Sequence, residues 1–560
     1  MGTIIAISPT RIKLRSDYCA IGNAMPTLDW IGKRAVINHH LTVPYRLLKG
    51  EEELSVGEAG SGNLLVQGDN LLALKALLPY YAGQVKCIYI DPPYNTGNES
   101  WVYNDNNNAP EMKKWLGRTV GKDAEDLSRH DKWLCMMYPR LQLLHQMLRE
   151  DGAIFISIDD NEIPQLRLMM DEIFGPQHFI ATVIWQKMDS PKNTAIHLSE
   201  DHDYIVIYAK NAKIWRPGRL PRNEKMLDRY KNPDNDPRGA WLLSDLAARN
   251  FYAAGRYEIV TPSGKVIAGP PAGSYWRVSR ERFDELDKDK RIWWGKSGNN
   301  RPGIKRFLTE VRDGVVPQTL WLWPDVGSTR NAKQEFSQLM EAKASSDLFI
   351  TPKPTRLIER ILQLASDKSS LILDSFAGSG TTGHAVMKLN AADGGNRRFI
   401  LVEMEENIAR TITAERIKRA INGYGDTPGL GGGFRFATLG TPLFDEHGQI
   451  SEDVHFADLA RHVYFSETGE PQPNTTNGKT PLIGVCGRTA YYLLFNGILG
   501  DKTAAGGNVL TDKILRQLPA HPMGSDNPRV IFGEGCRLGA ARLEREGIIF
   551  KQLPYEIKVN

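Results

Sequence analysis

The motif Asp91-Pro92-Pro93-Tyr94 directly follows the apolar run VKCIYI at residues 85–90. That run predicts a buried strand, and open α/β sheets bind ligands beyond the carboxyl ends of such strands. The exocyclic amine of a nucleobase is a poor nucleophile because its lone pair is delocalised into the ring. We expect the Asp91 carboxylate and the Pro92 carbonyl to accept its two hydrogens and draw the nitrogen toward a tetrahedral geometry. Tyr94 would stack on the extruded base; a rigid turn after a strand is the competing interpretation.

A second candidate site is the glycine-rich stretch DSFAGSGTT, which follows another apolar run. Glycines at a strand-to-helix turn let the backbone approach a ligand closely. Alignment on GxxxxGK[ST] places His384 and Ala385 where Lys and Ser or Thr are required, which argues against a phosphate-binding NTPase loop. The candidate ligand-binding residues of this stretch are Asp374, Phe376, Ala377, Gly378, Ser379, Gly380, Thr381 and Thr382.

Two more carboxylates stand at predicted strand ends. Glu403 follows the apolar run RFILV, 25 residues after Gly378, where it could bond both hydroxyls of a ribose. Asp69, followed by Asn70, ends the run LLVQGDN and could accept a hydrogen bond from an adenine amino group. Either carboxylate alone would be unremarkable in a loop. Four such features at four strand ends indicate a nucleoside-type ligand.

Alternating strand and helix patterns position these motifs. In residues 61–209, LLALKALLPYYAG and DKWLCMMYPRLQLLHQMLRED predict helices, the second ending before Gly152, while AIFISI, FIATVIW and DYIVIYA predict strands. The alternation returns in residues 346–445 with the predicted helix PTRLIERILQLA and the strands on either side of the glycine-rich turn. We therefore expect an α/β fold with a doubly wound, mostly parallel sheet.

The intervening residues 210–345 are rich in Pro, Gly, Asn and isolated aromatics, and predict an inserted domain of short strands and loops. Residues 211–310 contain 21 Lys and Arg against 12 Asp and Glu, and five of the twelve Trp. This excess of basic charge indicates a surface for a polyanion, with Arg and Asn suited to base contacts and aromatics suited to stacking. A solvated, loop-rich insert is the alternative.

Composition limits the class of protein. The 560 residues are 24% charged and 41% hydrophobic, as in globular proteins, and no apolar run approaches the roughly 18 residues of a membrane span. Five Cys without a CxxC pair argue against a zinc site or a disulfide framework. We expect a cytoplasmic chain with no metal site and no membrane association.

The order of the two motifs, DPPY before FAGSGTT, resembles the beta group of amino-methylating DNA methyltransferases, which use S-adenosylmethionine. The segments GDNLLALKALL, WLCMMYPRLQLLHQMLREDGAIFISIDDNE and HDYIVIYAKN resemble the Mod subunits of type III restriction–modification systems. TPKPTRLIERIL is similar to the family's pre-motif segment, which places Lys353 and Pro354 near the cofactor. The resemblance covers about residues 61–440.

The resemblance implies a permuted, seven-stranded methyltransferase sheet and transfer of a methyl group to N6 of adenine in duplex DNA. It places Asp69 and Asn70 at the cofactor adenine, residues 376–380 at its methionine moiety and Glu403 at its ribose. Asp91–Tyr94 would hold the flipped base, without a metal or covalent nucleophile. The implied domains are an N-terminal extension (1–60), the target-base half of the core (61–209), a target-recognition domain (210–345), the cofactor half (346–445) and a C-terminal domain without an assigned role (446–560).

Alternatives stay open. Methylation of N4 of cytosine uses the same acceptors, although Asp before PPY favours adenine. A catalytically silent DNA-binding specificity subunit is a different class, and the intact motifs argue against it. The resemblance to Mod subunits also implies a separate ATP-dependent restriction subunit (a nuclease or translocase) or another defence subunit, and it is compatible with a homodimer.

Overall fold

The computed structural model describes residues 28–96, 128–341, 351–445, 447–473, 480–497, 503 and 506–553. It divides into two compact units, one formed by Met1–Arg216 with Thr319–Asn560 and the other by Pro217–Gln318. The larger unit contains the central sheet, and the smaller one has its own short strands. Within the described ranges, no helix combines the length and the apolar character needed to cross a membrane.

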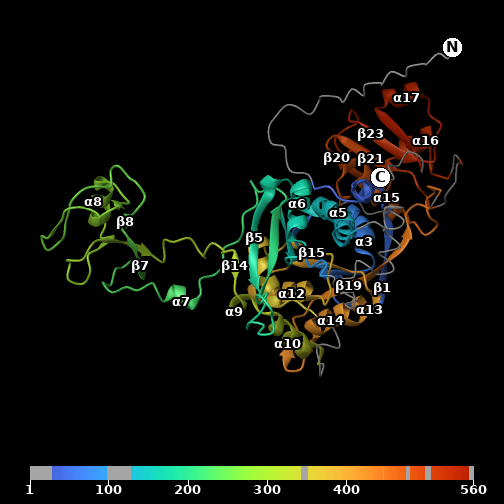
Figure 1. The fold of residues 1–560 in the computed structure, drawn as a ribbon. Coiled ribbons are helices and arrows are strands. Elements are labelled where there is room, and N and C mark those ends of the chain that lie inside the picture. Colours follow the sequence, from blue (N-terminus) through green and yellow to red (C-terminus); the bar gives the residue numbers. More distant parts are fainter. Residues whose placement is uncertain are drawn as a thin grey trace, which may run out of the picture. The chain divides into compact units, whose positions relative to one another are not determined.

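A ten-stranded sheet forms the centre of the larger unit (Figure 1). The strands β19, β2, β16, β15, β3 and β4 are neighbours in that order and run parallel, whereas β6 is antiparallel to both β4 and β5. Across the sheet the strands are β1 (Arg46–Gly57), β19 (Gly433–Pro442), β2 (Leu64–Gln67), β16 (Arg398–Glu403), β15 (Leu371–Asp374), β3 (Val85–Ile90), β4 (Leu148–Ile158), β6 (His202–Ala209), β5 (Phe179–Gln186) and β14 (Leu320–Trp321).

The seven consecutive strands from β2 to β5 form the predicted doubly wound, mostly parallel sheet, so the predicted fold class is confirmed. Three further strands widen the sheet: β1 pairs antiparallel with β19 along one edge, and β14 pairs parallel with β5 at the other. Apolar patterning does not indicate β1, because its sequence RLLKGEEELSVG is largely polar. It does not indicate β14 either, because that strand has only two residues.

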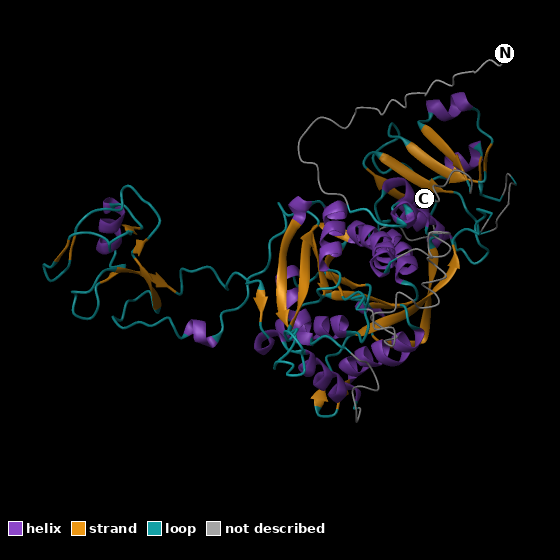
Figure 2. Ribbon diagram, viewed as in Figure 1, coloured by secondary structure: helices purple, strands orange, loops and turns teal. Residues whose placement is uncertain are grey.

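Helices cover both faces of the sheet (Figure 2). Successive residues of β16 point to opposite faces. Ile400 and Val402 share an apolar core with α3, α5 and α6, whereas Phe399 and Leu401 approach Gly383 of α12 on the other face. The helices of the larger unit that matter for the site are α3 (Asn70–Tyr81), α5 (Arg129–Met147), α6 (Ile163–Phe174), α10 (Thr329–Met340), α11 (Thr355–Ala365), α12 (Thr381–Asp393) and α14 (Ala414–Asn422).

The second predicted helix ends earlier than its sequence pattern indicated. The pattern predicted a helix up to Gly152, but α5 ends at Met147 and β4 already begins at Leu148. Leu148 is buried and pairs with Val85 of β3, and a register shift follows before the next pairs. Pairing within the sheet therefore overrides the helical spacing of the last turn.

Residues beyond the central sheet form a second α/β layer within the larger unit. Its four-stranded sheet has the order β20 (Leu482–Cys486), β21 (Thr489–Leu493), β23 (Arg529–Gly533) and β25 (Ile548–Gln552). The helix α15 (Phe456–Thr468) packs against α3 and so attaches this layer to the part of the core formed by residues 61–209. The other helices of this second layer are α16 (Asp512–Gln517) and α17 (Ala540–Arg545).

The smaller unit, Pro217–Gln318, is built from short elements around aromatic residues. Trp276 and Trp294 belong to its apolar core, and Trp241 is also buried. These three Trp side chains therefore support the fold, which corrects the expectation that they are available for stacking on a ligand. The principal elements are β7 (Trp241–Asp245), β12 (Ile292–Trp293) and β13 (Gly303–Phe307), which form a three-stranded sheet, and α8 (Arg280–Lys288).

Candidate active site

The carboxylates singled out in the sequence lie at one edge of the central sheet. The strands β2, β16, β15 and β3 are parallel neighbours. Glu403 and Asp374 are the last residues of β16 and β15, Asp91 follows β3 directly, and Asp69 lies two residues beyond β2. Because the carboxyl ends of parallel strands meet at the same edge, the fold brings these residues to one side of the molecule.

A narrow cavity opens between the two predicted motifs. Its volume is about 20 Å³, which is room for about one water molecule, so a nucleoside-sized ligand requires side chains to move. It is lined by Tyr89, Asp91, Thr351, Pro352, Lys353, Asp374, Phe376, Ala377, Gly378, Ser379, Thr381 and Thr382. Asp91 of the DPPY segment, the segment around Lys353 and the glycine-rich turn therefore line one cavity.

Both carboxylate oxygens of Asp91 are engaged inside this cavity. The Tyr94 hydroxyl donates to Oδ1 at 2.9 Å, and the Lys353 ammonium lies 2.5 Å from Oδ2. Trp133 Nε1 donates to the Pro93 carbonyl at 2.7 Å. The preceding carbonyl, that of Pro92, takes no part in this bond. Burial and the adjacent carboxylate raise the pKa of Tyr94 well above its usual value, so its hydroxyl remains a donor at neutral pH.

Two residues that sequence reasoning missed complete the surroundings of Lys353. Its ammonium lies 5.1 Å from the ring centroid of Tyr94 and 6.0 Å from that of Trp185, so two aromatic faces flank the cation. Trp185 is buried and donates to the Gly327 carbonyl at 3.0 Å. Burial raises the pKa of Asp203, although Lys187 at 2.6 Å and Lys353 oppose that shift. The signals that could have identified these two residues were their positions: Trp185 lies near the end of one predicted strand, and Asp203 lies at the start of the next.

Asp374 holds the glycine-rich turn from inside. Its Oδ1 accepts from the Phe376 amide at 3.0 Å and its Oδ2 from the Thr382 hydroxyl at 2.5 Å. The side chain is buried, and this burial raises the pKa of Asp374 to about 7 despite both hydrogen bonds. Gly378 and Gly380 have φ values of 52° and 77°, in the left-handed region that favours glycine. Asp374 thus shapes the turn that the glycines make possible.

The spacing of these glycines is also that of a nucleotide-binding turn. Gly378, Gly380 and Gly383 follow the G-x-G-x-x-G pattern, which dinucleotide-binding proteins share. A Cβ atom at Gly383 would lie 2.7 Å from the side chain of Ile417, so glycine permits close packing of α12 against α14. The glycine spacing alone therefore does not distinguish a site for an adenosyl cofactor from a site for a dinucleotide.

Glu403, Asp69 and Asn70 are held by the protein itself. The Glu403 side chain is buried and accepts from the amides of Gly378 and Glu405, each at 2.9 Å. Asp69 caps α3 and accepts from Arg140 at 3.0 Å, while Asn70 donates to the Ser375 carbonyl at 3.2 Å. Glu403 touches the turn directly, whereas Asp69 and Asn70 do not line the cavity.

Two supporting groups were not found from the sequence. Arg416 of α14 is buried, and its Nη1 donates to the hydroxyls of Ser379 at 3.0 Å and Thr381 at 2.8 Å; burial lowers the pKa of Arg416 to about 10. Asn95, which follows Tyr94, has a φ of 59° and bonds the buried Glu162. For Arg416, the only signal in the sequence was an Arg on the buried side of an amphipathic helix. For Asn95, the sequence contained no signal.

Comparisons with known proteins define the class. Residues 85–415 match the family model described as DNA methylase. The chain belongs to this family, which confirms the family read from DPPY and FAGSGTT. Among the residues that the structure describes, no three His, Cys, Asp or Glu side chains are grouped to hold a metal ion.

Two relatives are Mod subunits of type III restriction–modification enzymes. The chain is 34% identical over 455 residues to the StyLTI Mod subunit of Salmonella typhimurium, with 76% of this chain and 66% of that subunit covered. It is 32% identical over 447 residues to the EcoPI Mod subunit of Escherichia phage P1, covering 72% and 67%. It is also 29% identical over 379 residues to the type II methyltransferase M.KpnI of Klebsiella pneumoniae, covering 64% and 84%. The chain spans about two thirds of the length of the Mod subunits.

Proposed function

We propose that this chain transfers the methyl group of S-adenosylmethionine to N6 of adenine in duplex DNA. The observation that carries the proposal is the placement of Asp91, at the end of a central strand, in one cavity with the glycine-rich turn. Membership in the DNA methylase family and the similarity to Mod subunits support it.

The residues of the chain would act by positioning and polarising the target amine. Asp91 Oδ2, now paired with Lys353, would accept one amino hydrogen, and the Pro92 carbonyl would accept the other. The Tyr94 ring would stack on the flipped base, and the Asp91 carboxylate would stabilise the positive charge that develops on the nitrogen. Lys353 binds the oxygen of Asp91 that is proposed to accept the amine, so it would have to shift from this oxygen as the base enters.

The residues around the turn fit an adenosyl cofactor. The left-handed Gly378 and Gly380 keep the backbone free of Cβ atoms where a ligand must approach, and the Glu403 carboxylate lies beside them at the end of the next strand. Residues 376–380 and Glu403 would hold the cofactor, with Lys353 and Pro354 near it and Asp69 and Asn70 behind the turn. The cofactor supplies a methyl group that its sulfonium charge already activates.

We further propose that the insert reads the DNA sequence. Flipping a base costs a few kcal/mol and gives little sequence information, so recognition requires a further surface. Exchanging residues 210–345 for the insert of a related enzyme should change which sequence is methylated and leave cofactor affinity unchanged. An active chimera that still methylates the original sequence would place recognition elsewhere, for instance in residues 446–560.

A separate subunit is proposed for DNA restriction. The relatives are named Mod subunits, and the stretch from Gly378 to Ala385 lacks the Lys and Ser or Thr of an ATP-binding loop. The isolated chain should neither hydrolyse ATP nor cut DNA, and either activity would refute this part of the proposal. Light scattering on the same preparation tests the expected homodimer.

Sequencing the DNA of expressing cells with detection of base modifications tests the proposed activity. We expect N6-methyladenine at one short sequence, and none when Asp91→Ala replaces the wild-type chain. N4-methylcytosine at a fixed site would support the alternative base, and unmodified DNA would favour a silent specificity subunit.

A further inference from the structure

The loop between β5 and β6, residues 187–201, carries two apolar side chains that the fold leaves uncovered. Ile196 is 92% exposed and Leu198 is 85% exposed, the highest fractions among the large hydrophobic side chains of the described residues. Exposed apolar side chains close together commonly mark a binding surface. These two stand one residue apart on a loop of otherwise polar composition, so a binding role is the simplest reason for their type.

The loop is braced from within. Its two ends are joined by the Lys187 amide, which donates to the Asp201 carbonyl at 2.9 Å. Nearer the tip, the Lys192 amide donates to the Ser199 hydroxyl at 2.7 Å, and that hydroxyl donates to the Asp201 carboxylate at 2.5 Å. These bonds close the segment that contains Ile196, so the fold presents the apolar tip on an ordered base.

The base of the loop lies at the edge of the sheet that carries Asp91. Since β6 is antiparallel to both β4 and β5, the carboxyl end of β5 meets the same edge as those of β4 and β3. Lys187, the first loop residue, pairs with Asp203, whose pKa also responds to Lys353 and Asp91. A duplex that delivers a base to Asp91 must therefore lie against the side from which this loop emerges.

A basic groove adjoins the loop. The groove has a volume of about 930 Å³ and is lined by the start of the loop and by α10. Lys187, Arg330 and Lys333 contribute positive charge. The one lining carboxylate, Asp189, pairs with Arg330 at 3.2 Å, and Lys187 pairs with Asp203 outside the lining. The Thr329 amide donates to the Lys187 carbonyl and joins the two walls. This charge suits a nucleic-acid backbone.

We propose that Ile196 and Leu198 form an apolar wedge that enters the base stack where the flipped adenine has left, while the groove holds the adjoining phosphates. The inference rests on the proposed function. Ile and Leu are among the side chains that proteins insert between base steps, and the wedge would offset part of the cost of unstacking the flipped base. It would act as a positioning element and not on the reacting atoms.

The test compares two substrates of the sequence found by modification sequencing. In one the target adenine is paired, and in the other it faces an abasic site and leaves the stack easily. For Ile196→Ala with Leu198→Ala, we expect kcat/KM on the paired duplex to fall about tenfold or more and to recover to within about twofold on the abasic duplex. Ile549→Ala, which alters another exposed apolar side chain in the C-terminal layer, is the matched control.

A second readout follows flipping itself. With 2-aminopurine at the target position, its fluorescence should rise on binding of the wild-type chain and rise less with the double variant at saturating protein. An equal loss of kcat/KM on both duplexes, or no loss of kcat/KM on either, would overturn the proposed wedge. If the unchanged chain methylates neither duplex, the proposed function fails and the wedge fails with it. Melting curves of the variants should match the wild type because both side chains are exposed.

Discussion

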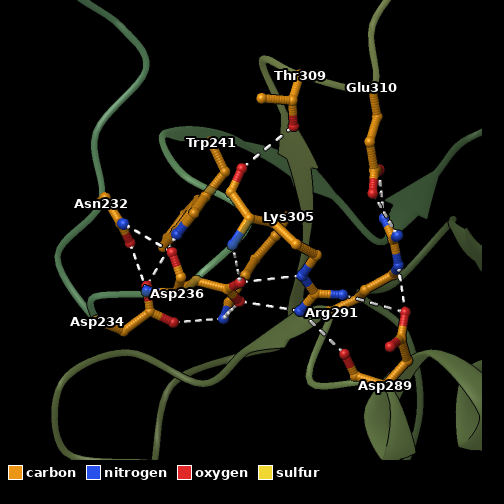
Figure 3. A network of polar contacts seen from close by, with 10 residues as sticks. Asn232, Asp234, Asp236, Trp241, Asp289, Arg291, Lys305, Thr309 and Glu310 are labelled. Carbon is orange, nitrogen blue, oxygen red and sulfur yellow. Dashed lines mark hydrogen bonds and ion pairs between the residues drawn. The ribbon is translucent and has the colours of Figure 1, made fainter.

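The edge of the central sheet that carries Asp91 and the insert use charged side chains in opposite ways. At this edge the predicted carboxylates are buried or partly buried, and Asp91, Asp374 and Glu403 each stand at or directly after the end of a strand. In the insert they are many, and a large share pair with one another (Figure 3). Position along a strand therefore singles out candidate site residues in the first region, whereas a count of charges does not single out candidate DNA contacts in the second.

The network in Figure 3 shows this for the insert. Lys305 is buried between Asp234 and Asp236, and Asp236 also binds Arg238 at 2.9 Å; bonds from Arg238 lower the pKa of Asp236. Arg291 in turn pairs with Glu310 at 2.6 Å. These basic residues stabilise the insert itself. Exposed basic side chains outside the network are better candidates for DNA: Arg249, Lys265, Lys296, Arg301 and Arg306.

Among variants that keep Asp91 itself, removing the counter-charge of Asp91 should have the largest effect. In Lys353→Met the partly buried carboxylate of Asp91 would lose its cation, and an uncompensated buried charge is destabilising, so we expect the side chain of Asp91 to leave the position in which it receives the amine. We expect kcat/KM to fall about a hundredfold. Lys551→Met, which breaks the ion pair with Glu467 in the C-terminal layer, should leave activity unchanged. An unchanged kcat/KM in Lys353→Met would contradict this role.

Replacing an exposed arginine of the insert should mainly lower DNA affinity, whereas replacing a paired arginine should mainly lower stability. Arg306→Ala removes an exposed charge and should weaken DNA binding about tenfold at low salt, with a smaller salt dependence, and leave the melting temperature unchanged. Arg291→Ala should lower the melting temperature and have the smaller effect on binding, because its pairs are internal. Arg516→Ala, at an exposed position outside the insert, is the control for net charge. A lower melting temperature in Arg306→Ala together with the larger loss of DNA binding in Arg291→Ala would contradict this contrast between exposed and paired arginines.

The smallest effect should come from Asp374, through pH-dependent stability. Its folded pKa is raised to about 7 by burial, so between about pH 4 and 7 the folded state keeps a proton that the unfolded state loses. Its contribution to stability is complete below pH 4 and falls as pH rises through 7. Asp374→Asn should therefore gain about 2–4 °C in melting temperature relative to the wild type between pH 5 and 8. The control Asp393→Asn, whose pKa Arg397 lowers, should show a constant difference over this range.

Strands and motifs could be predicted from the sequence because their signals are local. Apolar runs preceded each predicted carboxylate, and the fold placed those runs side by side. The partners of these carboxylates could not be predicted, because Lys353 and Asp91 are separated by 262 positions, and Arg140 and Asp69 by 71. Trp185 and Arg416 were missed for the same reason, since only the folded chain brings them to the site.

The most direct test of the account separates methyl transfer from cofactor binding in Asp91→Ala. With purified chain, duplex DNA and S-adenosylmethionine, we expect N6-methyladenine from the wild type, measured by mass spectrometry of nucleosides. In the variant, transfer should fall at least about a hundred- to a thousandfold, while cofactor affinity by calorimetry stays within about twofold. Asp160→Ala, an exposed carboxylate near the end of the neighbouring strand β4, should behave like the wild type. Near-normal turnover by Asp91→Ala would contradict the account.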